Sequence, residues 1–173
     1  ESVVAVLLEH GRAAVGASAA AVVRPVPGDP ATLEVVRAVG YDVPEFGAWA
    51  RFAASGPAPM ADAIRRGEPV WVATQRELAE RYPTVVPLAR AAGYEGWLAI
   101  PFVLGENGGR RVLGGLGVAF AAPHAVDEAD RAFLHALGLQ AAQALERQRA
   151  ETALRASEAR SRALIAHLPA GAA

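Results

Sequence analysis

Aromatic side chains gather between residues 46 and 97, and their types and spacing suit the binding of a small molecule. Phe46, Trp49 and Phe52 recur at intervals of three, so a helix would place them near one another. Aromatic rings and methionine offer broad apolar surfaces that can grip a flat or apolar ligand. The alternative is that they fill the core. The candidate pocket residues are Phe46, Trp49, Phe52, Met60, Trp71, Tyr82 and Trp97, with Tyr94 beside them.

Polar residues give little support for catalysis or metal binding. The chain has no cysteine, which excludes thiol catalysis, disulfides and thiolate metal sites. Neither a Ser-His-Asp motif nor an evident pair of carboxylates is present. Arg65-Arg66 and Arg110-Arg111 suit a phosphate or carboxylate, or a solvated surface. We predict no catalytic residue and no metal, and leave any cofactor unassigned. A compact metal motif does not fit the spacing of His10, His124, His135 and His167.

Composition narrows the partners of this 173-residue chain. It is 53% hydrophobic, so it can bury a sizeable core, and its net charge is −1. That charge gives no general attraction to nucleic acid or to an anionic membrane. No apolar run approaches the roughly 20 residues of a membrane span, so we expect a cytoplasmic location. All 17 basic residues are arginine, which together with the abundant alanine favours a bacterial source.

Two apolar runs near residue 107 predict the central hairpin of a sheet. Residues 97–103 and 111–119 flank Asn107-Gly108, a strong signal for a tight turn between antiparallel strands. Both runs are apolar at nearly every position instead of alternating. We therefore expect both faces of this hairpin to be covered.

The other elements follow from hydrophobic periodicity and from proline and glycine breaks. A helix over 1–15 precedes a strand pair at 19–26 and 32–40. Thr74 and Glu77 form a capping box at the start of a helix. We also predict helices over 42–52, 59–66, 75–81 and 85–92, and a short strand over 69–73.

A final helix is predicted to begin after Asp127. It should exceed thirty residues, because no helix-breaking residue ends it earlier. Asp127 is a good N-cap, and no proline follows until Pro169. The apolar side thins beyond Arg147, which is typical of a linker helix. We expect this helix to pair in parallel with its copy in a homodimer, through Leu134, Leu137, Ala141 and Leu145.

The order of elements predicts an α+β fold with one antiparallel sheet. Six segments follow one another in this order: GASAAA at 16–21, LEVVRAVG at 33–40, PMADAIRRGEPVWV at 59–72, WLAIPF at 97–102, VLGGLG at 112–117 and VDEADRAFLHALGLQAAQALE at 126–146. Through these segments the chain resembles the GAF family of regulatory domains over residues 1–148. After a helical linker at 149–165, residues 166–173 resemble the truncated start of a PAS domain.

This resemblance implies a sheet of five or six strands. The N- and C-terminal helices lie on one face, and short helices and loops roof a pocket on the other. Family members that attach a bilin or reduce methionine sulfoxide use cysteine, which is absent here. Members that bind cyclic nucleotides carry a lysine in their signature, and this chain has no lysine, so that ligand is not expected.

The predicted function follows from the resemblance. The chain is expected to be a sensory module of a multidomain bacterial signalling protein, such as a histidine kinase, protein phosphatase or nucleotide cyclase of a two-component system. It would bind a small molecule and relay the signal through a dimeric C-terminal helix to an output domain in the same chain. One alternative is a dimerisation and relay module without a ligand. A more remote alternative is an enzyme.

Overall fold

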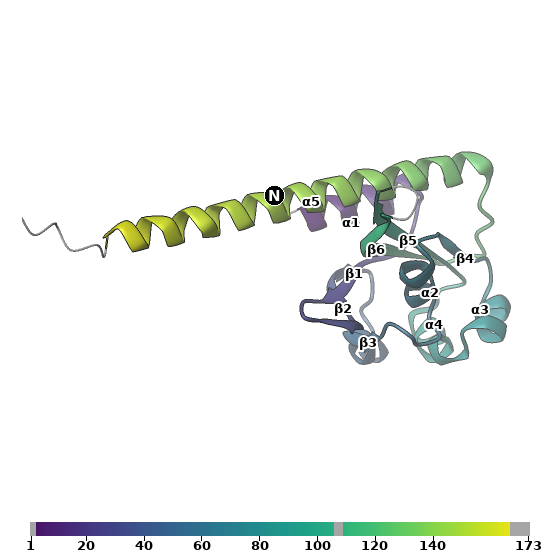
Figure 1. The fold of residues 1–173 in the computed structure, drawn as a ribbon. Coiled ribbons are helices and arrows are strands. Elements are labelled where there is room, and N and C mark those ends of the chain that lie inside the picture. The colour runs from purple at the N-terminus through teal and green to yellow at the C-terminus, as the bar shows by residue number, and fades with distance from the viewer. Residues whose placement is uncertain (1–2, 106–108, 167–173) are drawn as a thin grey trace, which may run out of the picture.

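The computed structural model describes residues 3–105 and 109–166. Six strands form one antiparallel sheet in the order β3-β2-β1-β6-β5-β4, which confirms the predicted α+β class (Figure 1). Within the described residues, none of the helices has the length and apolar character needed to cross a membrane. The elements are α1 (Val3–Ala14), β1 (Ala19–Val26), β2 (Asp29–Val39), η1 (Pro44–Trp49), β3 (Arg51–Ala53), α2 (Pro59–Arg66), β4 (Val70–Val72), α3 (Gln75–Arg81), η2 (Pro83–Val85), α4 (Val86–Ala92), β5 (Gly96–Leu104), β6 (Arg111–Phe120) and α5 (Glu128–Ala166).

The central hairpin is formed by β5 and β6, as the sequence predicted. Leu98 pairs with Val118 and Ile100 with Leu116, and a bulge follows Phe102. Its Asn107-Gly108 turn lies outside the described residues. Successive side chains of a strand point to opposite faces, and both faces are buried here, which explains why the runs are apolar at nearly every position.

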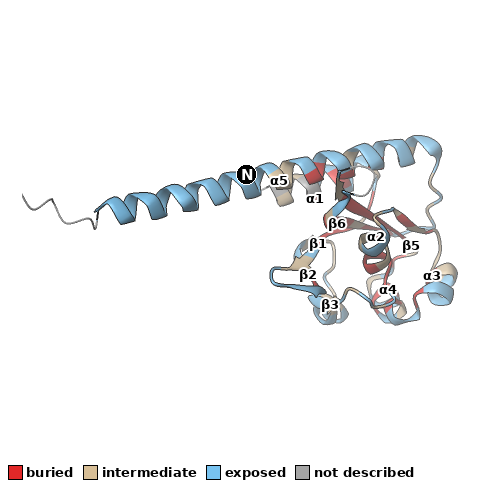
Figure 2. Ribbon diagram, in the orientation of Figure 1, coloured by how far each residue is buried: buried red, intermediate tan, exposed pale blue. Residues whose placement is uncertain are grey.

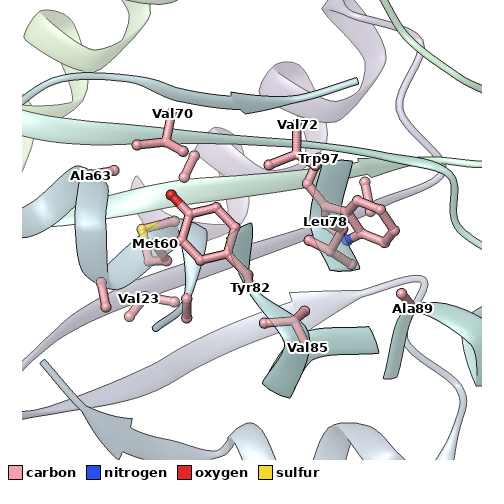
Figure 3. Packing of buried hydrophobic residues seen from close by; sticks show 14 of the residues in the cluster. Val23, Met60, Ala63, Val70, Val72, Leu78, Tyr82, Val85, Ala89 and Trp97 are labelled. Carbon is pink, nitrogen blue, oxygen red and sulfur yellow. The ribbon is translucent and has the colours of Figure 1, made fainter. Parts of the chain in front are cut away.

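The two faces of the sheet are covered by different elements. Helices α1 and α5 lie over one face, where they form the helix-face core (Figure 2). The short elements η1, α2, α3, η2 and α4 form a roof over the other face, with a separate roof core beneath them (Figure 3). The helix-face core includes Leu8, Leu98, Ile100, Phe102, Leu116 and Leu134, and the roof core includes Met60, Val72, Leu78, Tyr82 and Trp97.

The predicted helix over residues 42–52 is wrong in its second half. Only Pro44–Trp49 is helical, as a short 3-10 turn, and Arg51–Ala53 is the edge strand β3. β3 pairs with β2, with Leu33 opposite Phe52. The amide of Val35 also donates to the carbonyl of Ala50 across 2.9 Å. Strand pairing with an open sheet edge therefore overrides the weak helical preference of this segment.

The roof helices begin and end where the sequence places their caps. The amide of Glu77 donates to Thr74 Oγ1 across 3.2 Å, as the capping box predicts. The carboxylate of Glu77 reaches one residue further back than expected and accepts from the amide of Ala73 at 2.8 Å. Gly67 ends α2 in the left-handed conformation, with φ of 66°, and thereby releases the chain into β4.

Glycines in β6 admit Met60 of the roof to the sheet surface. A Cβ atom at Gly115 would stand 2.6 Å from Met60 Sδ and 2.8 Å from the carbonyl oxygen of Ile100. At Gly117 it would stand 3.2 Å from Met60 Cε. Neither position leaves ordinary contact space for a side chain, so β6 needs glycine for α2 to pack closely on it.

Helix α5 spans 39 residues and confirms the predicted length. Asp127 caps it, because its carboxylate accepts from the amide of Asp130 at 2.7 Å. The first half packs on the sheet. From Arg147 onward every described residue is exposed, and the helix projects beyond the domain (Figures 1 and 2).

Candidate ligand pocket between the sheet and the roof

A cavity of about 100 Å³ lies between the sheet and the roof. The strands contribute its floor, including Val23, Trp97 and Gly117. Its upper walls come from η1, β3, α2 and α4, which supply Phe46, Trp49, Phe52, Met60 and Leu88. Five of the seven predicted pocket residues therefore surround one space.

Aromatic contacts hold these walls in place. Trp49 and Phe52 meet edge to face, with ring centroids 5.4 Å apart and planes at 65°. Phe46 stacks on Tyr41 at 4.3 Å, and Tyr41 meets Tyr94 edge to face at 5.7 Å. The sequence analysis missed Tyr41, which lines the cavity. Tyr41 directly follows Gly40 at the end of a predicted strand and precedes the aromatic segment in the sequence. This position could have identified it.

Trp71 does not face the pocket, so its prediction is wrong. Its neighbours in β4, Val70 and Val72, belong to the roof core, whereas Trp71 packs against the helix-face core. The guanidinium of Arg131 on α5 lies 5.5 Å from the centre of the Trp71 ring. Successive side chains of a strand point to opposite faces, so Trp71 lies on the face opposite to its two neighbours. This alternation could have been used to place Trp71 from the sequence.

Tyr82 is buried in the roof core but does not line the cavity (Figure 3). Its hydroxyl donates to Asp62 Oδ2 across 2.8 Å and so joins α2 to the end of α3. Burial raises the pKa of Tyr82, and the hydrogen bond to Asp62 raises it further. The hydroxyl of Tyr94 donates to the carbonyl of Gly40, and burial raises the pKa of Tyr94 as well. Both tyrosines therefore brace the walls.

The cavity suits an uncharged apolar molecule. None of the described residues that line it is charged, and its polar side-chain atoms belong to Tyr41, Trp49 and Trp97. The phenol of Tyr41 is neutral near pH 7 at its ordinary pKa of 10.0, and burial raises this pKa further. A phosphate would enter this space without a cation to pair with, which disfavours a nucleotide.

The volume of the cavity limits what it can hold. Pockets for drug-sized ligands measure roughly 300–1,000 Å³. An engineered apolar cavity of about 150 Å³ takes up benzene. At about 100 Å³, the space beneath the roof has room for at most a small ring.

A second cleft of about 380 Å³ opens on the outer side of the same wall. Trp49, Phe52 and Leu88 line both spaces and therefore stand between them. The remaining residues of the outer cleft are Glu45, Ala48, Thr84 and Pro87. Sequence reasoning named no residue of this cleft beyond the two aromatics.

The residues predicted for the dimer interface are used inside the chain. Leu134 and Ala141 are each 1% exposed against the sheet. Leu137 and Leu145 are half-buried in the same helix-face core. The sheet therefore covers Leu134 and Ala141 and leaves them almost no surface for a second chain, while the predicted homodimer stays a prediction. The large apolar side chains that α5 leaves exposed are Phe133, Leu139, Leu154, Leu164 and Ile165.

Other polar candidates have structural partners. Arg65 pairs with Asp62, Arg110 donates to the carbonyl of Gly67, and Arg111 pairs with Glu146. His124 stacks on Phe120 at 3.8 Å. Within residues 3–105 and 109–166, no group of three His, Cys, Asp or Glu side chains converges to hold a metal.

The sequence model of the GAF domain family matches residues 1–146. The chain belongs to the GAF domain family. A search of curated proteins found no match. The predicted start of a PAS domain falls almost wholly outside the described residues and stays a prediction.

Solved structures share the fold of this GAF domain at low sequence identity. One is a domain of a protein assigned as a two-component sensor histidine kinase from Sinorhizobium meliloti 1021, with 18% identity, a TM-score of 0.66, and coverage of 87% of this chain and 94% of that chain. Another is the GAF domain of an Acinetobacter phosphoenolpyruvate-protein phosphotransferase, with 17% identity, a TM-score of 0.66, and coverage of 86% and 83%. A third is the second GAF domain of DevS from Mycobacterium smegmatis, with 16% identity, a TM-score of 0.65, and coverage of 88% and 96%.

Proposed function

We propose that this GAF domain is the sensory, regulatory part of a signalling protein and that it binds a small, uncharged, apolar molecule beneath its roof. The observation that carries the proposal is the apolar cavity walled by Trp49, Phe52, Met60 and Trp97, which is partly open to solvent and has no charged lining residue among those described. Structural neighbours come from a protein assigned as a sensor histidine kinase and from a phosphotransferase, which supports a regulatory and not a catalytic role.

Strand β5 offers a physical route from the cavity to α5. Trp97 and Ala99 line the cavity, and Ile100 and Phe102 belong to the helix-face core. Gly138 of α5 lies so close to β5 that a Cβ atom there would stand 2.9 Å from the carbonyl oxygen of Pro101. A ligand that displaces Trp97 would therefore shift the strand on which α5 rests, because packed interfaces of this kind have little free space.

We also propose a homodimer, whose interface differs from the one predicted from the sequence. Side chains recur about every 3.6 residues around a helix. On this period, Leu139, Leu154 and Ile165 project from the side of α5 that lies away from its sheet-facing residues Leu134 and Ala141. Pairing two copies of α5 through this outer face would cover these exposed side chains. We expect the two helices to run parallel, so that both chains lead to paired output domains.

The small volume of the cavity favours a second candidate function. A space of about 100 Å³ is also what an imperfectly filled core leaves behind. In that case the domain is a dimerisation and relay module that binds no ligand. The two candidates differ in whether any apolar compound stabilises the fold.

A thermal-shift titration with small neutral aromatics separates these candidates. A ligand at 100 times its Kd adds about 2.7 kcal/mol to the free energy of unfolding, which raises the melting temperature measurably. Ala58 lines the cavity and is 5% exposed, so Ala58→Leu should fill the space and abolish the shift. The matched control is Ala159→Leu on the exposed half of α5, which should keep it. An unchanged melting temperature across the whole compound set would favour the ligand-free relay.

A further inference from the structure

The inner cavity and the outer cleft differ from one another in charge and are divided by a thin wall. The inner cavity has only apolar and aromatic lining residues among those described. The outer cleft carries one charged residue, Glu45. Together the two spaces fall within the range of roughly 300–1,000 Å³ that is usual for small-molecule sites, whereas the inner one alone does not.

The dividing wall consists of side chains on short elements. Trp49 ends η1, Phe52 lies in the three-residue strand β3, and Leu88 lies in the seven-residue helix α4. Trp49 and Phe52 are both only half-buried. Changes of side-chain rotamer are common when proteins bind partners, even where the backbone hardly moves. A rotation of the Trp49 and Phe52 rings would join the two spaces without unfolding any element.

Polar atoms in the outer cleft accept hydrogen bonds. Among the described residues, none forms an ion pair with Glu45. Thr84 donates its hydroxyl proton to the carbonyl of Pro57 across 2.9 Å, so its oxygen is left as an acceptor. A carboxylate and a hydroxyl oxygen used in this way favour a ligand group that carries protons and positive charge.

We propose that this site takes arylalkylamines, with the apolar ring in the space formed when rotation of Trp49 and Phe52 joins the inner cavity to the outer cleft, and the protonated amine held beside Glu45. This inference rests on the proposed function, because it needs an apolar molecule beneath the roof. It adds a class of ligand, an order of preference and a role for Glu45. An aromatic carboxylate of the same size would be disfavoured, since its charge would meet Glu45.

Calorimetric titration of the 173-residue chain at low salt tests the inference with three probes of similar shape: tryptamine, neutral 3-ethylindole and indole-3-acetate. Tryptamine should bind about fivefold more tightly than 3-ethylindole, the upper end for an exposed ion pair, and indole-3-acetate should bind most weakly. Glu45→Gln should remove the advantage of tryptamine and leave the affinity for 3-ethylindole unchanged. Glu80→Gln, a change on the exposed side of α3, is the matched control and should keep the advantage.

The outcomes separate this inference from the proposed function. Equal binding of tryptamine and 3-ethylindole would overturn the preference for amines and leave an apolar site in place. An advantage of tryptamine that survives Glu45→Gln would overturn the role of Glu45. No binding of any probe would overturn the proposed function and this inference together. A fall in the tryptamine advantage at high salt, where charges are screened, would support the ion pair.

Discussion

The helix face and the roof of the sheet are built in different ways. The helix face is covered by two helices, of which α5 alone has 39 residues, and their contacts with the sheet are mainly apolar. The roof is made of three helices of seven or eight residues and two 3-10 turns. Side chains tie these pieces to nearby backbone: Arg65 donates to Ala54, Gln75 to Tyr94, Arg81 to Trp71 and Thr84 to Pro57.

We infer from this difference that the helix face is rigid and that the roof can change its conformation. Apolar burial over a long helix ties many residues into one cooperative unit. Each short roof helix buries only a few side chains in the roof core and adds hydrogen bonds of about 1 kcal/mol each, so we expect it to shift more readily than α5. Under the proposed function, a ligand that enters beneath the roof would rearrange it while the helix face transmits the change.

The largest expected effect lies on the helix face. Leu134 is 1% exposed between α5 and the sheet, so Leu134→Ala leaves a cavity there. We expect a loss of about 2–5 kcal/mol in the free energy of unfolding, measured by urea denaturation. Leu164→Ala, at a site that is 72% exposed, is the control and should change stability by less than about 0.5 kcal/mol. Similar losses in both variants would contradict the packing of α5 on the sheet.

A smaller loss is expected where the roof meets the sheet. Gly115→Val places atoms against Met60 and against the carbonyl of Ile100, and the carbonyl cannot move aside. Overpacking of this kind costs roughly 1–3 kcal/mol. Gly117→Ala meets only the flexible end of Met60 and should cost less. A larger loss in the free energy of unfolding for Gly117→Ala than for Gly115→Val, measured in denaturant, would contradict the close contact between α2 and β6.

Hydrogen bonds within the roof should contribute about 1 kcal/mol each. Tyr82→Phe removes the donor to Asp62, which keeps its pairing with Arg65. We expect a loss of about 1 kcal/mol in urea. Tyr94→Phe, which leaves the carbonyl of Gly40 without this donor, is the matched comparison. A loss as large as that of Leu134→Ala would mean that the roof is not a loosely held cover.

The raised pKa of Tyr82 predicts how the free energy of unfolding depends on pH. The pKa of Tyr82 is raised above its ordinary value of 10.0 in the folded chain, so the unfolded chain releases the proton first. Its stabilising effect is therefore complete below pH 10.0 and is lost as the pH rises through the folded-state pKa. Alkaline unfolding should be less steep in Tyr82→Phe. An identical pH profile in both proteins would exclude this contribution.

The smallest effect on stability is expected on the outer face of α5. Leu154→Glu should shift a dimer to monomer in light scattering and should leave the free energy of unfolding of the monomer, measured at high dilution, nearly unchanged. Leu137→Glu, on the half-buried side, should instead destabilise the domain itself. A fragment ending at Arg147 lacks the projecting half of α5 and should also be a monomer. A dimer that survives Leu154→Glu and this truncation would place the interface elsewhere.

Local signals in the sequence predicted the elements well. Caps and breaks such as Thr74, Gly67 and Asp127 act within one helical turn, so the boundaries of the roof helices and of α5 could be read directly. Arg51–Ala53 was mistaken for helix because its strand exists only through β2, which is distant in sequence. Short segments of this kind take their structure from their partners.

The candidate site was predictable in its composition and not in its shape. The aromatic cluster indicated Phe46, Trp49, Phe52, Met60 and Trp97, which line the cavity. The volume of the cavity and the outer cleft depend on packing across several elements, which no local pattern encodes. For α5, periodicity revealed an apolar face but could not say that the sheet of the same chain would cover it.

Gly138 gives α5 the geometry of a lever. It is the only glycine of the helix, and its lack of a side chain lets α5 rest directly on the backbone of β5 at Pro101. Ala166 lies 28 residues further on, or about 42 Å at 1.5 Å per residue. A tilt of about 10° around that fulcrum would sweep the far end through about 7 Å, more than one turn of helix. A movement too slight to open the domain would thus reach the far end of α5 as a displacement larger than one helical turn.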